Sequence, residues 1–215
     1  MKAVIFDMDG LMFDTENLTI PLWDTAGQKF GYRIPTNVVL KMVGISNVKS
    51  RSLLLEEYGN DFPYDEIRDE LRQIVRSEIE KNGVPKKPGL DYILDCLSAA
   101  GIPFGVATST RRETALYMLE RAGVLNKFTA VTGGDEVENG KPAPDIFLCA
   151  AEKLGASPSD CVGLEDSTAG LRGLHAAGIK SIFIKDVLEP PPEVLASVWR
   201  RCDDLKQAAA ALGLV

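Results

Sequence analysis

The run Ala3-Val4-Ile5-Phe6-Asp7-Met8-Asp9-Gly10 carries the strongest signal of the chain's architecture. Its four apolar residues lead directly into Asp7, a pattern typical of a buried strand whose carboxyl end lies at a site. Gly10 permits a tight turn that brings the backbone close to a ligand. Asp7 and Asp9 stand two residues apart, so one carboxylate can serve as nucleophile and metal ligand while the other transfers protons. An ordinary acidic turn would look the same in isolation.

Apolar runs of the same kind recur along the rest of the chain, over residues 104–107, 130–132, 162–164 and 181–184. Apolar residues at helical spacing lie between them: Leu90, Ile93, Leu94 and Leu97; Ala115, Met118, Leu119 and Ala122; Ile146, Phe147, Ala150 and Leu154; Leu171 and Leu174. Thr110 and Glu113 predict a capping box for the second of these helices. Alternating strands and helices predict an α/β fold with a doubly wound, Rossmann-like parallel sheet.

Residues 15–84 interrupt the alternation, because they carry helical patterns and no convincing strand. A spacing of four predicts one helix along Leu18, Leu22, Ala26 and Phe30, and a longer amphipathic helix along Ile67, Leu71, Ile74, Val75 and Ile79. We therefore expect an all-helical insert over residues 15–84, within a core formed by residues 1–14 and 85–215.

Composition narrows the possible partners. The chain has 24 Lys and Arg residues against 31 Asp and Glu, a net charge of −7, with no basic stripe for nucleic acid or an anionic membrane. An acidic protein that binds phosphate needs a local cation cluster or a metal. None of the four cysteines forms a C-x-x-C pair, and Lys2 is followed by too few apolar residues for a secretion signal. We expect a cytoplasmic monomer without a membrane span.

Further polar clusters follow predicted strands, at the edge where open α/β sheets bind ligands. Thr108-Ser109-Thr110 offers hydroxyls and amides to an anion, although a plain helix cap is the alternative. Lys141 precedes a helix start fixed by Pro142 and Pro144, where its ammonium can hold a phosphate oxygen. A solvated surface lysine is the alternative there.

The last cluster, Glu165-Asp166, comes directly after the predicted strand over residues 162–164. Two adjacent carboxylates are costly to bury without a cation. A hard divalent ion such as Mg²⁺ removes that cost, with oxygen ligands from Asp7 and Asp166. An exposed turn capped by Ser167 is the alternative. The clusters in this order favour one shared site over unrelated features.

In this order the clusters resemble the haloacid dehalogenase superfamily of phosphohydrolases, and the resemblance covers the whole chain. The runs Phe6-Asp7-Met8-Asp9-Gly10-Leu11-Met12-Phe13-Asp14-Thr15-Glu16, Gly140-Lys141-Pro142-Ala143-Pro144-Asp145-Ile146-Phe147 and Glu165-Asp166-Ser167 are similar, almost letter for letter, to the subgroup that holds sugar-phosphate phosphatases and β-phosphoglucomutase. The helical insert looks like that subgroup's small cap domain. The resemblance implies a magnesium-dependent phosphatase that acts on a small phosphorylated metabolite, such as a sugar phosphate, through an aspartyl-phosphate.

The resemblance also implies the roles of the acidic residues. Asp7 is the nucleophile, and Asp9 is the general acid and base. Mg²⁺ is held by Asp7, the backbone carbonyl of Asp9, and Asp166. Glu165 supports this metal site.

Phosphate-binding and substrate-binding roles follow in the same way. The resemblance assigns the transferring phosphoryl group to Thr108, the Ser109 amide and Lys141. Lys49 and Arg51 in the insert are candidate cations for a phosphate or sugar, with solvated helix residues as the alternative.

Two departures bear on the reaction type. β-Phosphoglucomutase-like proteins carry a histidine in the first cap helix, where Thr19 stands here, and a cap arginine shortly after a glycine, where Gly44 is followed by Ile45-Ser46-Asn47. Both departures favour a phosphatase over a hexose phosphate mutase, which stays the second hypothesis; a catalytically silent sugar-phosphate sensor is the third. Trp23 is a candidate substrate contact, with a packing residue as the alternative. The sequence does not identify the substrate.

Overall fold

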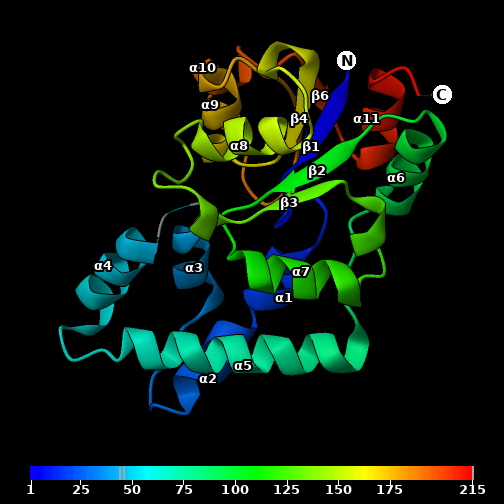
Figure 1. Ribbon diagram of the computed structural model, residues 1–215. Helices are drawn as coiled ribbons and strands as arrows, with labels where there is room; N and C mark the ends of the chain where they lie inside the picture. Colours follow the sequence, from blue (N-terminus) through cyan, green and yellow to red (C-terminus); the bar gives the residue numbers. More distant parts are fainter. Residues whose placement is uncertain (44, 46, 215) are drawn as a thin grey trace. The chain divides into compact units, whose positions relative to one another are not determined.

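The computed structural model describes residues 1–43, 45 and 47–214 (Figure 1). The chain divides into two compact units, which we call the core unit and the helical insert. The core unit contains Met1–Asp14 and the chain from Val84 onward, and the helical insert contains Thr15–Gly83. Val84, expected to be the last residue of the insert, groups with the core unit. Gly44 and Ser46, which the comparison with the mutase pattern used, lie outside the described residues.

Within the described residues, the core unit contains a parallel sheet of six strands in the order β3-β2-β1-β4-β5-β6. The strands are β1 (Ala3–Phe6), β2 (Phe104–Ala107), β3 (Ala130–Thr132), β4 (Cys161–Glu165), β5 (Lys180–Ile184) and β6 (Arg200–Cys202). β1 is central and pairs Val4 with Phe104 on one side and with Val162 on the other. Because the strand order reverses at β1, its carboxyl end is the point where α/β folds of this kind bind ligands.

Helices cover both faces of the sheet, which confirms the doubly wound α/β prediction. They are α6 (Leu90–Ala99), α7 (Arg112–Arg121), α8 (Asp145–Lys153), α9 (Thr168–Ala176), α10 (Pro192–Leu195) and α11 (Leu205–Ala211). Figure 1 shows α8 and α9 on one side of the sheet and α6 and α11 on the other. Strand residues alternate between the faces, so Ala3 and Ile5 pack with Phe147 of α8 while the Phe6 ring meets Phe104 edge-on.

The sixth strand was not predicted. β6 lies at the edge of the sheet, paired only with β5 among the described strands, and both Arg200 and Arg201 are exposed. An edge strand with charged side chains carries no apolar run for a sequence pattern to detect.

The helical insert contains α1 (Thr15–Thr19), α2 (Leu22–Gln28), α3 (Thr36–Val39), α4 (Asn47–Tyr58) and α5 (Tyr64–Asn82). Its core is built around buried side chains such as Ile34, Leu54 and Ile67. The long amphipathic helix is confirmed as α5. The single helix predicted along Leu18 to Phe30 is wrong, because the chain breaks into two helices before Pro21, whose ring lacks a backbone N–H.

Within the part of the chain that the structure describes, no helix is both long and apolar enough to cross a bilayer.

Candidate active site

Two buried carboxylates stand side by side at the carboxyl end of the central strands. Asp7 directly follows β1, and its amide donates to the carbonyl of Leu164 over 3.0 Å, which continues the sheet pairing. Glu165 is the last residue of β4, and only 1% of it is exposed, against 6% of Asp7. The parallel pairing of β1 with β4 therefore brings together two acids that are far apart in the sequence.

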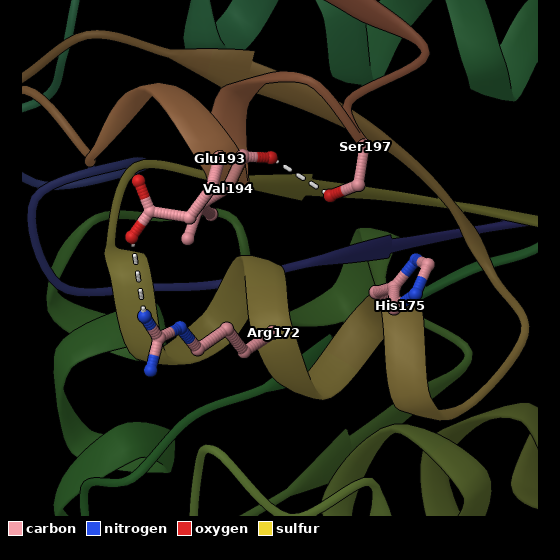
Figure 2. Close-up of a pocket in the computed structure, with 5 residues that line it drawn as sticks. All are labelled: Arg172, His175, Glu193, Val194 and Ser197. Carbon is pink, nitrogen blue, oxygen red and sulfur yellow. Dashed lines mark hydrogen bonds and ion pairs between the residues drawn. The ribbon is translucent and has the colours of Figure 1, made fainter.

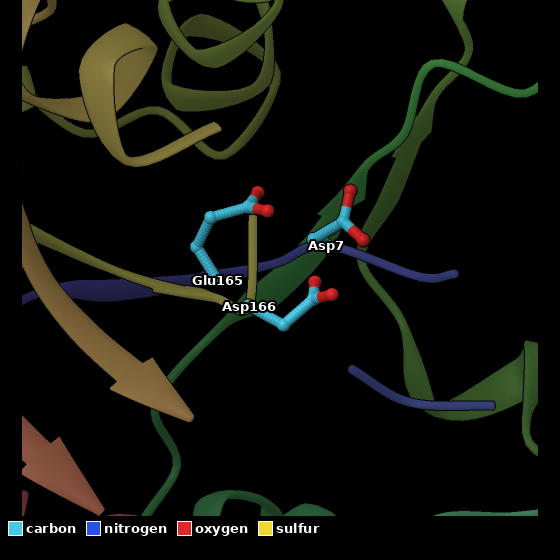
Figure 3. Close-up of side chains that lie close together, drawn as sticks. All are labelled: Asp7, Glu165 and Asp166. Atoms are coloured by element: carbon cyan, nitrogen blue, oxygen red, sulfur yellow. The ribbon is translucent and has the colours of Figure 1, made fainter. Parts of the chain in front are cut away.

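Asp166 completes a cluster of three carboxylates. Ligand oxygens of Asp7, Glu165 and Asp166 all lie within 4.8 Å of one another (Figure 3). Asp166 Oδ1 is buried and has no hydrogen-bond partner among the described residues. A buried carboxylate oxygen without a donor is costly, and an all-oxygen ligand set is what Mg²⁺ prefers. The residues present therefore fit a divalent cation.

Lys141 supplies positive charge to the same cluster. Its side chain is 5% exposed, and its ammonium contacts Asp7 and lies 2.8 Å from Glu165 Oε2. The ammonium also lies over the Phe147 ring, 4.8 Å from the ring centroid. The lysine that sequence analysis assigned to phosphate binding is thus at the end of β1, beside Asp7.

The electrostatics of the cluster show an excess of negative charge. Burial raises the pKa of Asp7 to about 8, with the Glu165 carboxylate acting in the same direction and the Lys141 ammonium against it. The pKa of Asp166 is also raised well above its usual value, first by burial and then by the charge of Glu165. Burial alone would lower the pKa of Lys141, but its carboxylate partners raise it above the ordinary value. One ammonium does not offset three clustered carboxylates, two of them on buried residues, so a second cation would favour their ionised forms.

Glu165 is fixed by its surroundings. Its Oε1 accepts hydrogen bonds from the Ser167 amide at 3.0 Å and the Ser167 hydroxyl at 2.7 Å, and its Oε2 accepts from Lys141. The Ser167 hydroxyl in turn caps α9 by accepting from the Gly170 amide, as the sequence predicted. Glu165 is therefore held beside Asp7 by three hydrogen bonds.

Asp9 belongs to a separate hydrogen-bond cluster with two threonines. Its Oδ2 accepts from the Thr110 hydroxyl at 2.7 Å and from the Thr108 hydroxyl at 3.3 Å. The predicted capping box of Thr110 and Glu113 is wrong, because α7 begins after Arg111 without a side-chain cap. The hydroxyl of Thr110 is directed to Asp9 instead, so Thr110 joins the site residues.

Ser109 is exposed between these threonines, and the loop after β3 packs closely against its backbone. The Gly134 amide donates to the Thr110 carbonyl at 2.9 Å, and Asp135 accepts from the Arg112 amide at 2.7 Å. A Cβ on Gly134 would lie 2.4 Å from the Ser109 carbonyl oxygen. Only glycine permits this close approach, which shapes the turn that carries the Ser109 amide.

Two residues at this end of the sheet were not predicted from the sequence. Asp186 follows β5 by two residues, and Lys87 pairs with it over 2.6 Å. The rule that located Asp7 and Asp166, an acid just beyond an apolar strand, also applies to Asp186.

The three candidate substrate residues all belong to the helical insert. Trp23 packs on the insert core, with its ring tilted against Tyr64 at a centroid distance of 6.4 Å. Arg51 pairs with Asp65 over 3.2 Å at the surface, and Lys49 is exposed. Their proposed roles in substrate binding stay predictions.

A shallow hollow of about 240 Å³ on the core unit is lined by Arg172, His175, Glu193, Val194 and Ser197 (Figure 2). An ion pair of 3.9 Å between Arg172 and Glu193 spans it. None of the predicted site residues lines it, and the chain's only histidine does. It is separate from the carboxylate cluster.

Comparison with known proteins decides the family. The sequence model of the haloacid dehalogenase-like hydrolases matches residues 4–184. This chain belongs to that family. The phosphorylated carbohydrates phosphatase of Thermotoga maritima is 32% identical over 189 residues, which cover 85% of this chain and 84% of that protein. The beta-phosphoglucomutase of Bacillus subtilis is 30% identical over 192 residues, 86% of this chain and 83% of that protein.

A solved structure supports the same assignment. A haloacid dehalogenase family hydrolase from Deinococcus radiodurans, crystallised with bound phosphate and sodium, is 25% identical, with a TM-score of 0.80. The alignment covers 100% of this chain and 97% of that one. The resemblance predicted from the motifs is confirmed, and this haloacid dehalogenase-like hydrolase is an enzyme of the phosphoric monoester hydrolase class.

Proposed function

We propose that this enzyme hydrolyses a small phosphorylated metabolite, a sugar phosphate, through a phosphoryl intermediate on Asp7. The observation that carries the proposal is the buried Asp7 carboxylate at the reversal of strand order, in contact with the Lys141 ammonium and beside Glu165 and Asp166. Phosphorylated carbohydrates, acted on by the Thermotoga maritima relative according to its name, give the substrate class.

A divalent cation fits the proposed site. Asp7, Asp166 and the backbone carbonyl of Asp9 would hold Mg²⁺, with Glu165 in support, and the unpartnered Oδ1 of Asp166 supports this. When bound, Mg²⁺ neutralises negative charge on the phosphoryl oxygens.

The phosphoryl group is held by residues of the surrounding loops. The Lys141 ammonium and the Ser109 amide donate to its oxygens in the proposed complex. The Thr108 hydroxyl turns from Asp9 to donate to them as well. Lys141 then contacts both the nucleophile and the transferring group, and its positive charge favours ionised Asp7.

In the first step, an oxygen of ionised Asp7 attacks phosphorus and the bond to the leaving oxygen breaks. Asp9, as the carboxylic acid, transfers its proton to that oxygen, and the alcohol product leaves. In the second step, the Asp9 carboxylate takes a proton from water, whose oxygen attacks the phosphorus of phospho-Asp7. The bond between phosphorus and Asp7 breaks, which restores the Asp7 carboxylate and releases inorganic phosphate. The bond from Thr110 at 2.7 Å holds Asp9 for both proton transfers.

The helical insert is proposed to act as the cap that selects the substrate, and Lys49, Arg51 and Trp23 are its proposed substrate contacts. This role rests on the resemblance to the cap of the sugar-phosphatase subgroup.

A phosphomutase is the second candidate, because the Bacillus subtilis beta-phosphoglucomutase is 30% identical. Thr19, which stands where such mutases carry a histidine, favours the phosphatase. Incubation with β-glucose 1-phosphate separates the two, since a phosphatase releases inorganic phosphate and a mutase produces glucose 6-phosphate.

The proposal is tested by measuring phosphate release from a panel of phosphorylated sugars, polyols and glycolate with Mg²⁺ present. The wild type should hydrolyse at least one sugar phosphate. The Asp7→Asn variant should not hydrolyse that substrate. Equal release by Asp7→Asn would rule out the proposed nucleophile.

A further inference from the structure

A fourth carboxylate, Asp186, lies beside the three-carboxylate cluster. Its side chain is 7% exposed, and it follows β5, the neighbour of β4 in the sheet. A Cβ built on Gly10 would lie 2.9 Å from Asp186 Oδ2 and 2.4 Å from Asp166 Oδ2. The two oxygens thus converge on one small space beside the Gly10 backbone, which turns there at a φ of +83°. Such an arrangement is repulsive unless a cation or hydrogen-bond donors lie between the oxygens.

Lys87 fixes the orientation of Asp186. Its ammonium lies 2.6 Å from Asp186 Oδ1 and 3.5 Å from Asp14 Oδ1, and its side chain is 16% exposed. The Lys87 amide donates to the Met12 carbonyl at 2.9 Å, and the Asp14 amide donates to the Pro85 carbonyl at 2.8 Å. Lys87 is therefore anchored by its backbone, and it leaves Oδ2 of Asp186 directed toward Gly10.

We propose that Asp186 is a positioning residue of the cation site, held in place by Lys87 and accepting a hydrogen bond at Oδ2 from the hydration shell of the cation. The inference rests on the proposed function, because it concerns the Mg²⁺ held by Asp7 and Asp166. Mg²⁺ in proteins retains several waters, and partners outside its direct ligands orient the site. Asp186 is not among the three direct candidates, whose oxygens lie within 4.8 Å of one another.

A substitution of Lys87 distinguishes a positioning role of Asp186 from a simple charge effect. Lys87→Met removes a positive charge, so a pure charge effect would make the site more negative and bind Mg²⁺ more tightly. Positioning predicts the opposite, because Asp186 loses the partner that fixes its carboxylate. Asp186→Glu distinguishes the same two explanations, since it keeps the charge but moves the carboxylate by one methylene. Only the positioning role predicts weaker Mg²⁺ binding in this variant.

The test is a calorimetric titration of Mg²⁺ into the metal-free protein, which measures its affinity for the ion. Asp186→Asn, Asp186→Glu and Lys87→Met should each weaken Mg²⁺ binding roughly 10- to 100-fold, as expected for loss of a partner that orients a metal site. The double variant Lys87→Met/Asp186→Asn should be no weaker than Asp186→Asn, because the two residues act as a pair.

The matched control is Lys2→Met/Asp160→Asn, an ion pair of 2.9 Å that precedes β1 and β4 at the opposite end of the sheet. It should bind Mg²⁺ as the wild type does. Thermal unfolding in EDTA establishes whether each variant is folded. If Asp186→Asn does not fold, Asp186→Glu takes its place as the test of Asp186.

The outcomes distinguish this inference from the proposed function. If the wild type binds no Mg²⁺, or if Asp166→Asn binds it as well as the wild type, the proposed metal site is wrong. If the wild type binds Mg²⁺ and Asp166→Asn does not, unchanged affinity in the folded Asp186 variants, or tighter binding in Lys87→Met, overturns the positioning role alone.

Discussion

Gly170 leaves the space that the Glu165 carboxylate occupies: a Cβ on Gly170 would lie 2.0 Å from Glu165 Cδ. Gly170→Ala should therefore displace Glu165, and with it the Lys141 ammonium beside Asp7. Alanine would favour the helix by about 1 kcal/mol, but this overlap outweighs that gain. We expect activity to fall about 10²-fold, the typical cost of a small misplacement in a catalytic site.

Steady-state kinetics of Gly170→Ala should be compared with those of Gly178→Ala. Gly178 has a φ of +70°, and apart from its chain neighbours no described atom lies within 4 Å of its Cβ position, so that variant loses stability without crowding the site. Wild-type activity in a folded Gly170→Ala variant would show that the position of Glu165 is unimportant.

Activity should require Mg²⁺ and disappear in EDTA, because three carboxylates share one cluster, and within the described residues only the Lys141 ammonium contacts them. Calcium should inhibit, since its larger and looser coordination shell misaligns Asp7 for attack. Phosphate release measured with each ion checks both statements. Full turnover without metal, or normal turnover with calcium, would contradict them.

The metal-free protein should become less stable as pH rises toward the raised pKa of Asp7, which is about 8 instead of 3.8. Between these two values the native state binds more protons than the unfolded state, so the free energy of unfolding falls as pH increases. We expect the unfolding temperature in EDTA to drop between about pH 6 and pH 8 more in the wild type than in Asp7→Asn. Mg²⁺ should reduce this difference between the wild type and Asp7→Asn. Equal pH dependence of the two unfolding temperatures would contradict the raised pKa of Asp7.

Asp9→Asn should retain Mg²⁺ and phosphate-analogue binding but lose about 10²- to 10⁴-fold in turnover, the usual contribution of general acid–base catalysis. Thr110→Val should lose less, because it removes only the hydroxyl that orients Asp9 over 2.7 Å. With p-nitrophenyl phosphate, whose leaving group is a weak base, the acid half matters less. The loss in Asp9→Asn should then be smaller for this substrate than for a sugar phosphate; equal losses would argue against Asp9 as the acid.

The sequence predicts those parts of the site that depend on strand ends. Asp7 and Glu165 could be placed beside each other because each follows an apolar run and parallel strands align their carboxyl ends. Lys141 contacts Asp7 across 134 positions of sequence. Its place before a proline-fixed helix start and the motif resemblance both indicated a role in phosphate binding, but neither predicted the contact with Asp7.

What the sequence did not predict depends on long-range packing. The Lys87–Asp186 pair joins residues 99 positions apart. The end of an apolar strand marks Asp186, but no motif marks Lys87 or pairs the two residues. The hydroxyl of Thr110 has two possible partners in the sequence, a helix end and Asp9, and only the fold decides between them. β6 is charged at the sheet edge and has no apolar pattern to find.

The most direct test of the mechanism is acid-quenched mass spectrometry of the enzyme during turnover of a phosphorylated sugar. We predict a phosphoryl adduct on residue 7 in the wild type, its accumulation in Asp9→Asn with p-nitrophenyl phosphate, and its absence in Asp7→Asn. A phosphoryl group mapped to any other residue, or metal-dependent hydrolysis with no adduct at all, would contradict nucleophilic attack by Asp7.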